Sequence, residues 1–528
     1  MLAKVATAAL MGIDAFRVDL EVDLARQGLP AFVMVGLAEG ALRESRERVL
    51  AALKNSGFKL PPARITVNLA PADMRKEGSG YDVPLAMGLL AAAGVVPLEA
   101  LAGYFFAGEL SLTGEVKAVP GMLPLAVKAR DEGARGVVVP EANGAEAAVV
   151  DGLAVYGVRT LGQVVAFVTG QEVLAPVADG SAAAWAERAV HTRDFAEVKG
   201  QEHAKRAIEI AAAGSHNLLF MGPPGSGKTM LAQRIPSVLP PLSFDEALEV
   251  TKVYSVAGML APGTALVAER PFRSPHHTIS DAGLIGGGAY PRPGEVSLAH
   301  RGVLFLDELP EFKKNVLEVM RQPLEDGGVT IARAAVSLRY PADFMLVAAM
   351  NPCPCGHLSD EQHACGCTPQ QVQRYRSRIS GPLLDRIDLH VEVPAVPYRD
   401  LQGRKTGMGS GAMRARIEAA RAVQARRYAG TTLLTNSDLS GKWLERFCAL
   451  GEVEHAFLGQ AVSSLGLSAR AYTRVLRIAR TIADLELVGA DGQAAPRDTP
   501  DNAAATPPLT VAHLAEAINY RTLDRRQG

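Results

Sequence analysis

The feature that most constrains this chain is the octapeptide GPPGSGKT at residues 222–229. It matches the pattern G-x-x-x-x-G-K-[ST], and it lies between the apolar run LLFM and the helix-compatible MLAQRI, which is the strand–loop–helix context that the pattern requires. Glycines let the loop curl so that successive N–H groups face phosphate oxygens. The sequence therefore predicts an α/β fold with a phosphate-binding loop (P-loop) formed by Gly222, Pro223, Pro224, Gly225, Ser226, Gly227, Lys228 and Thr229.

Two other apolar runs end in polar residues. GVLFLDEL ends in Asp307 and Glu308, and FMLVAAMN ends in Asn351. Continuous apolar runs are typical of strands buried on both faces of a parallel sheet, and such sheets bind ligands at their carboxyl ends. We predict that Lys228 contacts the β- and γ-phosphates, that Thr229 and Asp307 bind Mg²⁺, that Glu308 polarises the attacking water and that Asn351 orients it.

Length and composition narrow the possible classes of protein. At 528 residues the chain is long enough for about three domains. Apolar residues make up 48% and charged residues 21%, values typical of a folded protein. The net charge of -1 means that any contact with DNA must come from local clusters. The longest charge-free apolar stretch, residues 83–98, is shorter than the roughly 20 residues that span a bilayer. We expect a cytoplasmic protein with no membrane contact.

Pattern and composition divide the chain into five segments. Residues 1–170 alternate short Val-rich runs with helical stretches, which indicates a mixed α/β domain. Residues 171–193 are expected to be a linker, 194–400 the core with the P-loop, and 401–413 a flexible joint. Residues 414–528 show helical spacing and predict a helical lid, in which the polar, Pro-rich stretch 489–508 is expected to be a disordered loop.

One arginine lies in an unusual place. In ISGPLLDRIDLHVEV, Arg386 lies between two aspartates, just before a predicted strand. The P-loop of the same chain has no obvious need for a cation at this position. An exposed arginine there suits a finger that reaches the γ-phosphate held by a neighbouring subunit. The alternative is a surface ion pair with Asp385.

With GPPGSGKT, VLFLDE, AAMN and LLDRIDL in this order, the region 194–400 resembles an AAA+ ATPase of the magnesium chelatase clade. Longer strings, among them RPFRSPHHTIS, PRPGEVSLAHRGVLFLDELPEF and LSARAYTRVLRIARTIADL, resemble the ComM/YifB group over nearly the whole chain. The resemblance implies a homo-hexameric ring with ATP at subunit interfaces, with Arg386 as arginine finger and Arg470 as sensor 2.

The group's known activity gives the leading functional expectation, which is a DNA helicase that promotes branch migration when incoming single-stranded DNA pairs with the chromosome. The alternative from the same clade is a chelatase-type motor that remodels a protein partner. A third hypothesis is an ATP-gated scaffold without motor activity.

The N-terminal domain resembles the Lon protease domain, which has a ribosomal-protein-S5-like fold. In RKEGSGYDVPLAMGLLAA the place of the serine nucleophile falls on Gly80, and in LTGEVKAVPGMLPLAVKA the place of the catalytic lysine falls on Pro124. Shifting the alignment to Ser79 still leaves no base. Because peptide hydrolysis by this route needs a nucleophile and a base, we expect a structural or DNA-contacting domain.

Candidate DNA contacts lie in the Gly-, Pro- and His-rich stretch 270–302, which in this clade faces the channel of the ring. Backbone phosphates require only positive donors. A second hairpin, GGVTIARAAVSLRYPADF, and the basic stretch 374–427, with 12 Lys plus Arg against 5 Asp plus Glu, add further cations. The candidate residues are Arg270, Arg273, His276, His277, Arg292 and Arg333.

Four of the five cysteines fall in NPCPCGHLSDEQHACGCTP. Four thiolates suit a tetrahedral Zn²⁺ that would stabilise the loop. His357 and His363 are substitute ligands, and free reduced thiols are the other interpretation. The cysteines concerned are Cys353, Cys355, Cys365 and Cys367, whereas Cys448 is expected in a helix core.

Overall fold

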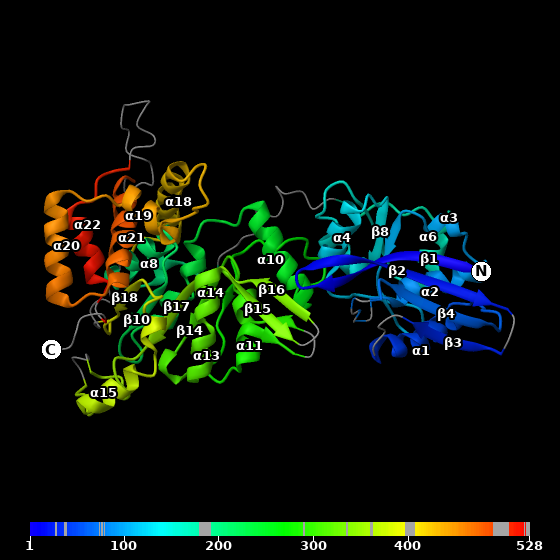
Figure 1. The fold of residues 1–528 in the computed structure, drawn as a ribbon, viewed down its shortest axis with the longest axis horizontal. Coiled ribbons are helices and arrows are strands. Elements are labelled where there is room, and N and C mark those ends of the chain that lie inside the picture. The colour runs from blue at the N-terminus through cyan, green and yellow to red at the C-terminus, as the bar shows by residue number, and fades with distance from the viewer. Residues whose placement is uncertain are drawn as a thin grey trace.

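The computed structural model describes residues 1–26, 29–35, 40–72, 74, 76, 78, 80–178, 192–288, 291–333, 336–358, 363–396, 407–488, 506–521 and 523. The molecule is elongated, with three parts in chain order along its length (Figure 1). A mixed α/β domain lies at one end, a parallel α/β core lies in the middle and a group of helices lies at the other end.

The N-terminal domain is built on a seven-stranded sheet in the order β3-β4-β2-β1-β5-β8-β9. Alternate residues of its long antiparallel strands are buried, as expected for a sheet covered on one face. Helix α2 is buried along its entire length. The elements are β1 (Leu2–Met11), β2 (Asp14–Ala25), β3 (Ala31–Val35), α1 (Gly40–Asn55), β4 (Arg64–Ala70), α2 (Asp82–Ala92), α3 (Leu98–Leu101), β5 (Tyr104–Phe106), β6 (Glu109–Leu110), β7 (Val116–Lys117), α4 (Met122–Asp131), β8 (Gly136–Pro140), α5 (Gly144–Ala147), β9 (Ala154–Val158) and α6 (Leu161–Val168).

The core contains a five-stranded sheet in the order β11-β14-β17-β10-β18, and every pairing in it is parallel. Strands β10, β14 and β17 are buried along their whole length, as their unbroken apolar runs predict. The elements are α8 (Glu202–Gly214), β10 (Leu218–Met221), α9 (Lys228–Ala232), α10 (Phe244–Ala257), β11 (Phe272–Arg273), α11 (Asp281–Ile285), β12 (Gly286–Gly287), β13 (Arg292–Pro293), α12 (Glu295–Leu298), β14 (Val303–Leu306), α13 (Lys314–Val319), α14 (Arg321–Asp326), β15 (Gly328–Arg333), β16 (Val336–Pro341), β17 (Met345–Met350), α15 (Pro369–Arg376), α16 (Gly381–Leu384) and β18 (Leu389–Glu392).

The C-terminal part is helical and packs on α8 of the core, with which it shares one hydrophobic cluster. A buried ion pair between Arg427 and Asp484 joins two of its helices, and Asn436 also donates to Asp484 at 2.9 Å. The elements are α18 (Ser410–Arg427), α19 (Gly441–Phe447), α20 (Glu452–Leu465), α21 (Ala469–Glu486) and α22 (Val511–Asn519).

The connecting segments differ in part from the sequence expectation. The expected joint 401–413 overlaps α18, which begins at Ser410. The Ser410 hydroxyl accepts from the Phe195 amide at 2.9 Å, so this end of the joint is anchored to the core. In the expected linker, the Val177 amide donates to the Val155 carbonyl at 2.8 Å and so extends the first domain. Linker residues 179–191, joint residues 401–406 and loop residues 489–505 lie outside the described residues.

The N-terminal domain docks on the core through α4 and α10. Leu123 of α4 and Val250 of α10 belong to one buried cluster. Around it, the Glu146 carboxylate accepts from the Leu123 amide at 2.9 Å and from the Ser255 hydroxyl of α10. The tip of the β1–β2 hairpin reaches the β15–β16 hairpin, where Ile13 packs on the core (Figure 1). Across the described part of the chain, no helix is both long and apolar enough to cross a membrane.

Candidate active site

Strand register brings the polar ends of three strands to one edge of the core sheet. Met221, the last residue of β10, pairs with Met350, the last residue of β17. The P-loop and Asn351 therefore leave the sheet side by side. Leu306, which ends β14, pairs with Ala348 of β17, so the next residue, Asp307, joins them at the carboxyl edge. This edge is where parallel sheets bind ligands.

The P-loop backbone depends on its glycines. Gly225 and Gly227 have φ angles of +76° and +91°, in the left-handed region that side chains disfavour. At Gly222 a Cβ atom would lie 2.0 Å from the carbonyl oxygen of Val393, so only glycine fits beside β18. The local sequence therefore specifies a tight turn that leads into α9 at Lys228.

The Lys228 ammonium lies inside the loop. Its Nζ donates to the carbonyl oxygens of Gly222 at 2.8 Å and Pro223 at 2.9 Å, and to Oδ1 of Asn351 at 3.2 Å. Burial lowers the pKa of Lys228, and the nearby carboxylates of Asp307 and Glu308 act in the opposite direction. The structure thus brings together the lysine that follows β10 and the P-loop and the asparagine that follows β17.

Oxygen ligands for a divalent cation lie next to the lysine. The Thr229 hydroxyl donates to Oδ2 of Asp307 at 2.7 Å. A hydroxyl and a carboxylate that close together are the hard oxygen ligands that Mg²⁺ prefers, so these two residues fit the ion that was predicted for them.

Glu308 contacts a histidine from the segment after β11. Its backbone has a φ of +52°, a left-handed conformation that is uncommon for a residue with a side chain. Its carboxylate lies 3.4 Å from Nδ1 of His277, which follows β11. This contact lies on the β11 side of β14, whereas β10, which leads into the P-loop, lies on the other side of β14. His277, expected to contact DNA, instead touches the predicted catalytic glutamate.

The arginines predicted to act on ATP lie at the opposite edge of the sheet. The Arg386 carbonyl accepts from the side chain of Asn217, the residue before β10, at 2.8 Å. The four residues of β10 separate this edge from the P-loop by about 13 Å. Arg470 is paired with Asp385 at 2.8 Å and is 66% exposed.

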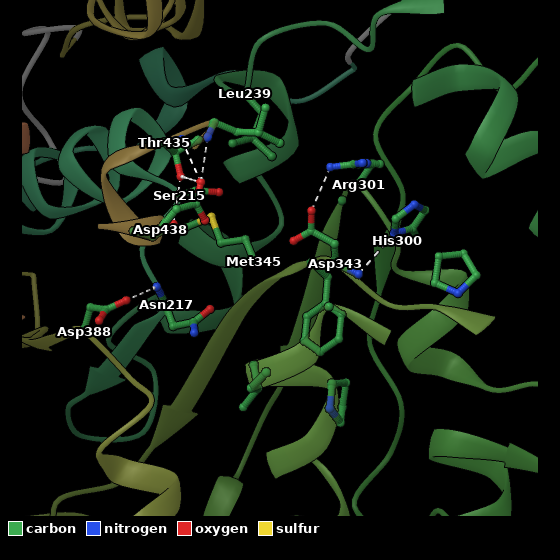
Figure 2. A pocket seen from close by; sticks show the side chains of 18 of the residues that line it. Ser215, Asn217, Leu239, His300, Arg301, Asp343, Met345, Asp388, Thr435 and Asp438 are labelled. Atoms are coloured by element: carbon green, nitrogen blue, oxygen red, sulfur yellow. Dashed lines mark hydrogen bonds and ion pairs between the residues drawn. The ribbon is translucent and has the colours of Figure 1, made fainter. Parts of the chain in front are cut away.

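A cleft of about 1610 Å³ opens at this edge, between the core and the helical part (Figure 2). Figure 2 shows Asn217 and Asp388 beside the strand ends, and the Arg301–Asp343 pair across the cleft from Asp438. The cleft carries charges of both signs, with seven arginines and eight carboxylates in its lining. Its seven arginines are Arg270, Arg301, Arg386, Arg421, Arg470, Arg474 and Arg477.

Arg386 is more enclosed than the sequence suggested. The side chain is 10% exposed and contacts Glu325 and the Pro382 carbonyl. The expected surface pair with Asp385 is made by Arg470 instead. Burial lowers the pKa of Arg386, and the neighbouring cations, Arg470 among them, add to the effect. Arg386 therefore lies in a cleft where most arginines have carboxylate neighbours.

Two other candidate DNA contacts have structural partners. Arg270 donates to the carbonyls of Pro240 at 2.5 Å and Arg301 at 2.6 Å, and burial lowers its pKa. Arg273 forms a two-point pair with Glu295 at 2.6 and 2.8 Å. Both arginines were expected to contact DNA phosphates. In the structure, both guanidinium groups instead bind carbonyl or carboxylate groups of the same chain.

The remaining candidates are more accessible. His276 and Arg292 are exposed, and Nδ1 of His276 lies 2.9 Å from the Thr278 hydroxyl. Arg333 ends β15, and its side chain lies outside the described part. In the basic stretch 374–427, Arg416 pairs with Glu209 at 2.6 Å and Arg421 donates to the Ala212 carbonyl at 2.8 Å. Part of that positive surplus therefore attaches the helical part to the core.

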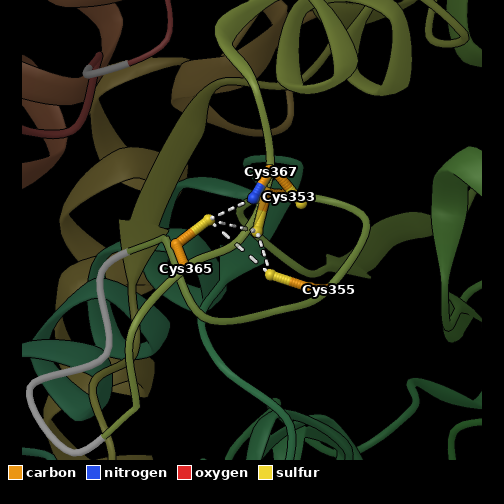
Figure 3. A group of neighbouring side chains, drawn as sticks. All are labelled: Cys353, Cys355, Cys365 and Cys367. Atoms are coloured by element: carbon orange, nitrogen blue, oxygen red, sulfur yellow. Dashed lines mark hydrogen bonds between the residues drawn. The ribbon is translucent and has the colours of Figure 1, made fainter.

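The four clustered cysteines also meet. Their Sγ atoms all lie within 4.8 Å of one another, directly after Asn351 (Figure 3). Cys448 is buried in the helical part, as expected, and burial raises the pKa of its thiol to about 12.

Comparison with known families identifies the chain. A family model described as "Magnesium chelatase, subunit ChlI" matches residues 194–401. Models for the N-terminal ChlI domain and the ChlI C-terminal domain match residues 20–143 and 407–491. The chain is 43% identical to the competence protein ComM of Haemophilus influenzae, over 99% of this chain and 98% of that protein. The chain belongs to the ComM/YifB family.

Other relatives agree with this placement. The YifB protein of Escherichia coli is 42% identical over 99% of this chain and 98% of its own length. Lon protease 2 of Bacillus subtilis is 30% identical over 31% of this chain and 34% of that protein. A ComM/YifB protein thus combines a ChlI-type N-terminal domain, a parallel AAA-like core and a helical C-terminal domain. The ChlI-type AAA domain implies an ATPase that uses ATP and Mg²⁺, and ChlI-family AAA proteins oligomerise.

Sequence reasoning missed two residues at these sites. Arg474 lines the cleft and pairs with Asp388. It stands four residues after Arg470 on α21, a spacing that places both on one helix face and was a usable signal. The side-chain amide of Gln201 donates to the Ser226 carbonyl at 3.4 Å and to the Pro394 carbonyl at 2.6 Å. It thereby connects the segment before α8 to the P-loop. No residue pattern marked it in advance.

Proposed function

We propose that this protein is a ring-forming DNA motor in which ATP bound by the P-loop of one subunit is hydrolysed with the help of arginines from the next. The opposite placement of Lys228 and Arg386 on the core sheet carries this proposal. The same chain cannot bring both groups to one nucleotide without breaking the sheet. A neighbouring copy whose arginine edge covers the P-loop would supply the missing cation.

Each residue then has a separate role. Lys228 and the amides of the P-loop hold the phosphates, and Thr229 and Asp307 hold Mg²⁺. An Mg²⁺ ion held by these two residues would supply positive charge that offsets the charge of the phosphates. Glu308 polarises the attacking water and Asn351 orients it. Arg386 and Arg470 of the neighbouring subunit stabilise the charge that develops on the γ-phosphate.

DNA is proposed as the substrate on two grounds. A relative that covers nearly the whole chain is named a competence protein, and the stretch after β11 exposes His276 and Arg292. By resemblance, we propose a hexamer that promotes branch migration of single-stranded or branched DNA during integration of transforming DNA, which would be a cytoplasmic activity. Contacts limited to phosphates would make binding independent of sequence and sensitive to salt.

The N-terminal domain is proposed to have a Lon-protease-like fold without proteolytic activity. Pro124, at the place of the catalytic lysine, is buried in α4, and Gly80 packs near Val119. Ser79 lies outside the described residues. Neither Gly80 nor Pro124 offers a nucleophile or a base.

Mixing two inactive variants tests the shared site. Arg386→Ala removes the arginine and keeps the P-loop, whereas Lys228→Ala does the reverse. We expect each variant alone to have little ATPase activity and the mixture to recover part of it, because some interfaces then join an intact P-loop to an intact arginine. Lack of recovery from variants that assemble, together with full turnover by an isolated wild-type monomer, would refute the proposal.

Stimulation of the ATPase tests the substrate. We expect turnover to rise with single-stranded or forked DNA, and labelled strands to separate. The alternative, a chelatase-type motor acting on a protein partner, is favoured only by the family description. It predicts no response to DNA and no strand separation in a preparation that hydrolyses ATP.

A further inference from the structure

The four clustered thiols have the spacing of ligands around one tetrahedral ion. Sγ of Cys353 lies 3.4 Å from that of Cys355 and 3.7 Å from that of Cys365, and Cys355 and Cys365 are 3.6 Å apart. With Zn–S bonds of about 2.3 Å, the sulfurs of a regular tetrahedron are about 3.8 Å apart. A disulfide would need about 2.05 Å. The spacing therefore fits a shared metal better than a disulfide.

One backbone amide is directed at the sulfur cluster. The backbone amide of Cys367 donates to Sγ of Cys365 at 3.4 Å. Sulfur-directed amides stabilise a thiolate and orient it toward a metal. Cys353 is buried and Cys355 is exposed, so the cluster has an inner anchor and an opening to solvent. Four thiolates in a tetrahedral arrangement are a ligand set for zinc.

The turn formed by Cys355 and Gly356 also packs against the P-loop. Gly356, which directly follows Cys355, has a φ of +90°. A Cβ atom at this glycine would lie 2.6 Å from Cδ and 2.8 Å from Cγ of Pro224. The backbone of the turn thus lies in close contact with the wall of the P-loop, at a position that tolerates no side chain.

The same segment contacts the P-loop at a second point. Asn351 lies two residues before Cys353, and its Oδ1 accepts from Nζ of Lys228 at 3.2 Å. The carbonyl of Pro352, between them, accepts from Arg376 of α15 at 3.3 Å. The cysteines therefore belong to the connection between β17 and α15, which contacts the P-loop through Asn351 and Gly356.

We infer that Cys353, Cys355, Cys365 and Cys367 bind one Zn²⁺, and that the metal holds the turn at Gly356 against Pro224, so that zinc occupancy sets the affinity of the P-loop for ATP. This rests on the proposed role of the P-loop as the ATP site. Without the metal, nothing links the four sulfurs, and the turn is no longer held against Pro224. Pro224 then loses its contact with Gly356, and the position of Asn351, which accepts a hydrogen bond from Lys228, is no longer fixed.

The full chain, purified without added metal, provides the first test. Elemental analysis should find about one zinc per chain. Removing it with a chelator that leaves Mg²⁺ in place should weaken binding of a fluorescent ATP analogue about ten-fold, as expected for one lost charge-assisted contact. Added ZnCl₂ should restore the affinity. Iron in place of zinc, or no metal, overturns the metal assignment, and an unchanged Kd in the stripped protein overturns the coupling.

Variants separate the metal from its effect. Cys355→Ser combined with Cys365→Ser should lose zinc and bind the analogue weakly, whereas Cys448→Ser, a matched change in the helical part, should keep both. Gly356→Ala should keep zinc and still weaken binding, because the added methyl collides with Pro224. Normal affinity in Gly356→Ala would refute the contact.

Two further measurements distinguish a failure of the zinc proposal from misfolding of a variant and from a failure of the proposed ATP site. If the double serine variant does not fold, judged by circular dichroism, the stripped wild-type chain and Gly356→Ala still decide the question. Lys228→Ala tests the P-loop separately. If this variant binds the analogue like the wild type, the proposed ATP site is wrong whatever the zinc content.

Discussion

Nδ1 of His277, in the segment that follows β11, lies 3.4 Å from Oε2 of Glu308, which follows β14. His277 belongs to the same stretch as the exposed candidate DNA contact His276, and the two rings lie 4.1 Å apart. A movement of this stretch on binding DNA would therefore change the position of Glu308. The contact links the proposed DNA-binding segment to the proposed catalytic base.

Replacing His277 tests that link. His277→Ala should raise ATP turnover in the absence of DNA about two- to five-fold, because an exposed pair is worth up to about 1 kcal/mol and its loss frees Glu308 to face the water site. Stimulation by DNA should shrink correspondingly. Steady-state ATPase assays with and without DNA measure both effects.

The neighbouring histidine provides the control. His276→Ala, whose ring contacts Thr278, should leave basal turnover unchanged. A fall in the activity of His277→Ala to the level of a variant lacking the Glu308 carboxylate would show that His277 orients the base and does not restrain it.

Replacing Glu308 itself should separate binding from turnover. Glu308→Gln keeps the size of the side chain and removes its basicity, so we expect ATP affinity close to that of the wild type and a loss of turnover of roughly a hundred-fold or more. Equilibrium binding of a fluorescent ATP analogue and a phosphate-release assay measure the two quantities. Undiminished turnover would exclude Glu308 as the base.

The sequence predicted the carboxyl edge of the core sheet well. Asp307 and Asn351 directly follow apolar runs, and Lys228 lies in the glycine-rich loop that follows a third. Neighbouring parallel strands bring such ends to the same edge of the sheet. The order of the strands was not needed for this prediction, because any parallel sheet that contains these strands as neighbours places their carboxyl ends at the same edge.

The partners of single side chains were less predictable. Arg270 and Arg273 looked like free cations because their carbonyl and carboxylate partners lie 22 to 31 residues away in the chain. His277 looked like part of a channel loop, since its contact with Glu308 depends on the left-handed backbone at that residue. Local pattern carries little information on such long-range pairing.

A buried ion pair in the helical part predicts a large stability effect. Asp484 is fully buried and accepts from Arg427 at 2.5 Å, while Arg480 lies 3.3 Å away. Asp484→Ala leaves two buried cations without their carboxylate and should lower the free energy of unfolding by about 3–5 kcal/mol. Urea unfolding followed by tryptophan fluorescence measures the loss, since Trp443 packs against the same cluster.

An exposed pair in the N-terminal domain is the matched control. Glu141 pairs with Arg159, and their side chains are 54% and 74% exposed. Glu141→Ala should cost at most about 1 kcal/mol. Equal losses for the two variants would contradict the distinction between buried and exposed pairs.

His390 predicts a pH dependence of stability. It is buried in β18, and neither ring nitrogen has a hydrogen-bond partner among the described residues. Burial lowers the pKa of His390 well below its usual value, Arg521 and Arg474 add to the effect, and Asp388 opposes it. The folded chain therefore keeps this ring neutral while the unfolded chain binds a proton below about pH 6.5. Stability is lost as the pH falls from there, by about 1.4 kcal/mol per pH unit for this group.

His390→Leu should remove this part of the dependence. The free energies of unfolding of the wild type and the variant, compared at pH 7.5 and pH 5.5, should diverge by about 1.4 kcal/mol in favour of the variant at the lower pH. A difference that is the same at both values would show that His390 becomes protonated in the folded protein.

The shared cluster of Leu123 and Val250 has a practical consequence for work on this protein. A truncated chain that starts at the ATPase core would expose the apolar side of α10 to water, and such a surface promotes aggregation. Aggregation or low activity of that fragment would then result from the exposed apolar surface and not from a defect in the ATPase site. Biochemical reconstitution should therefore begin from the full-length polypeptide.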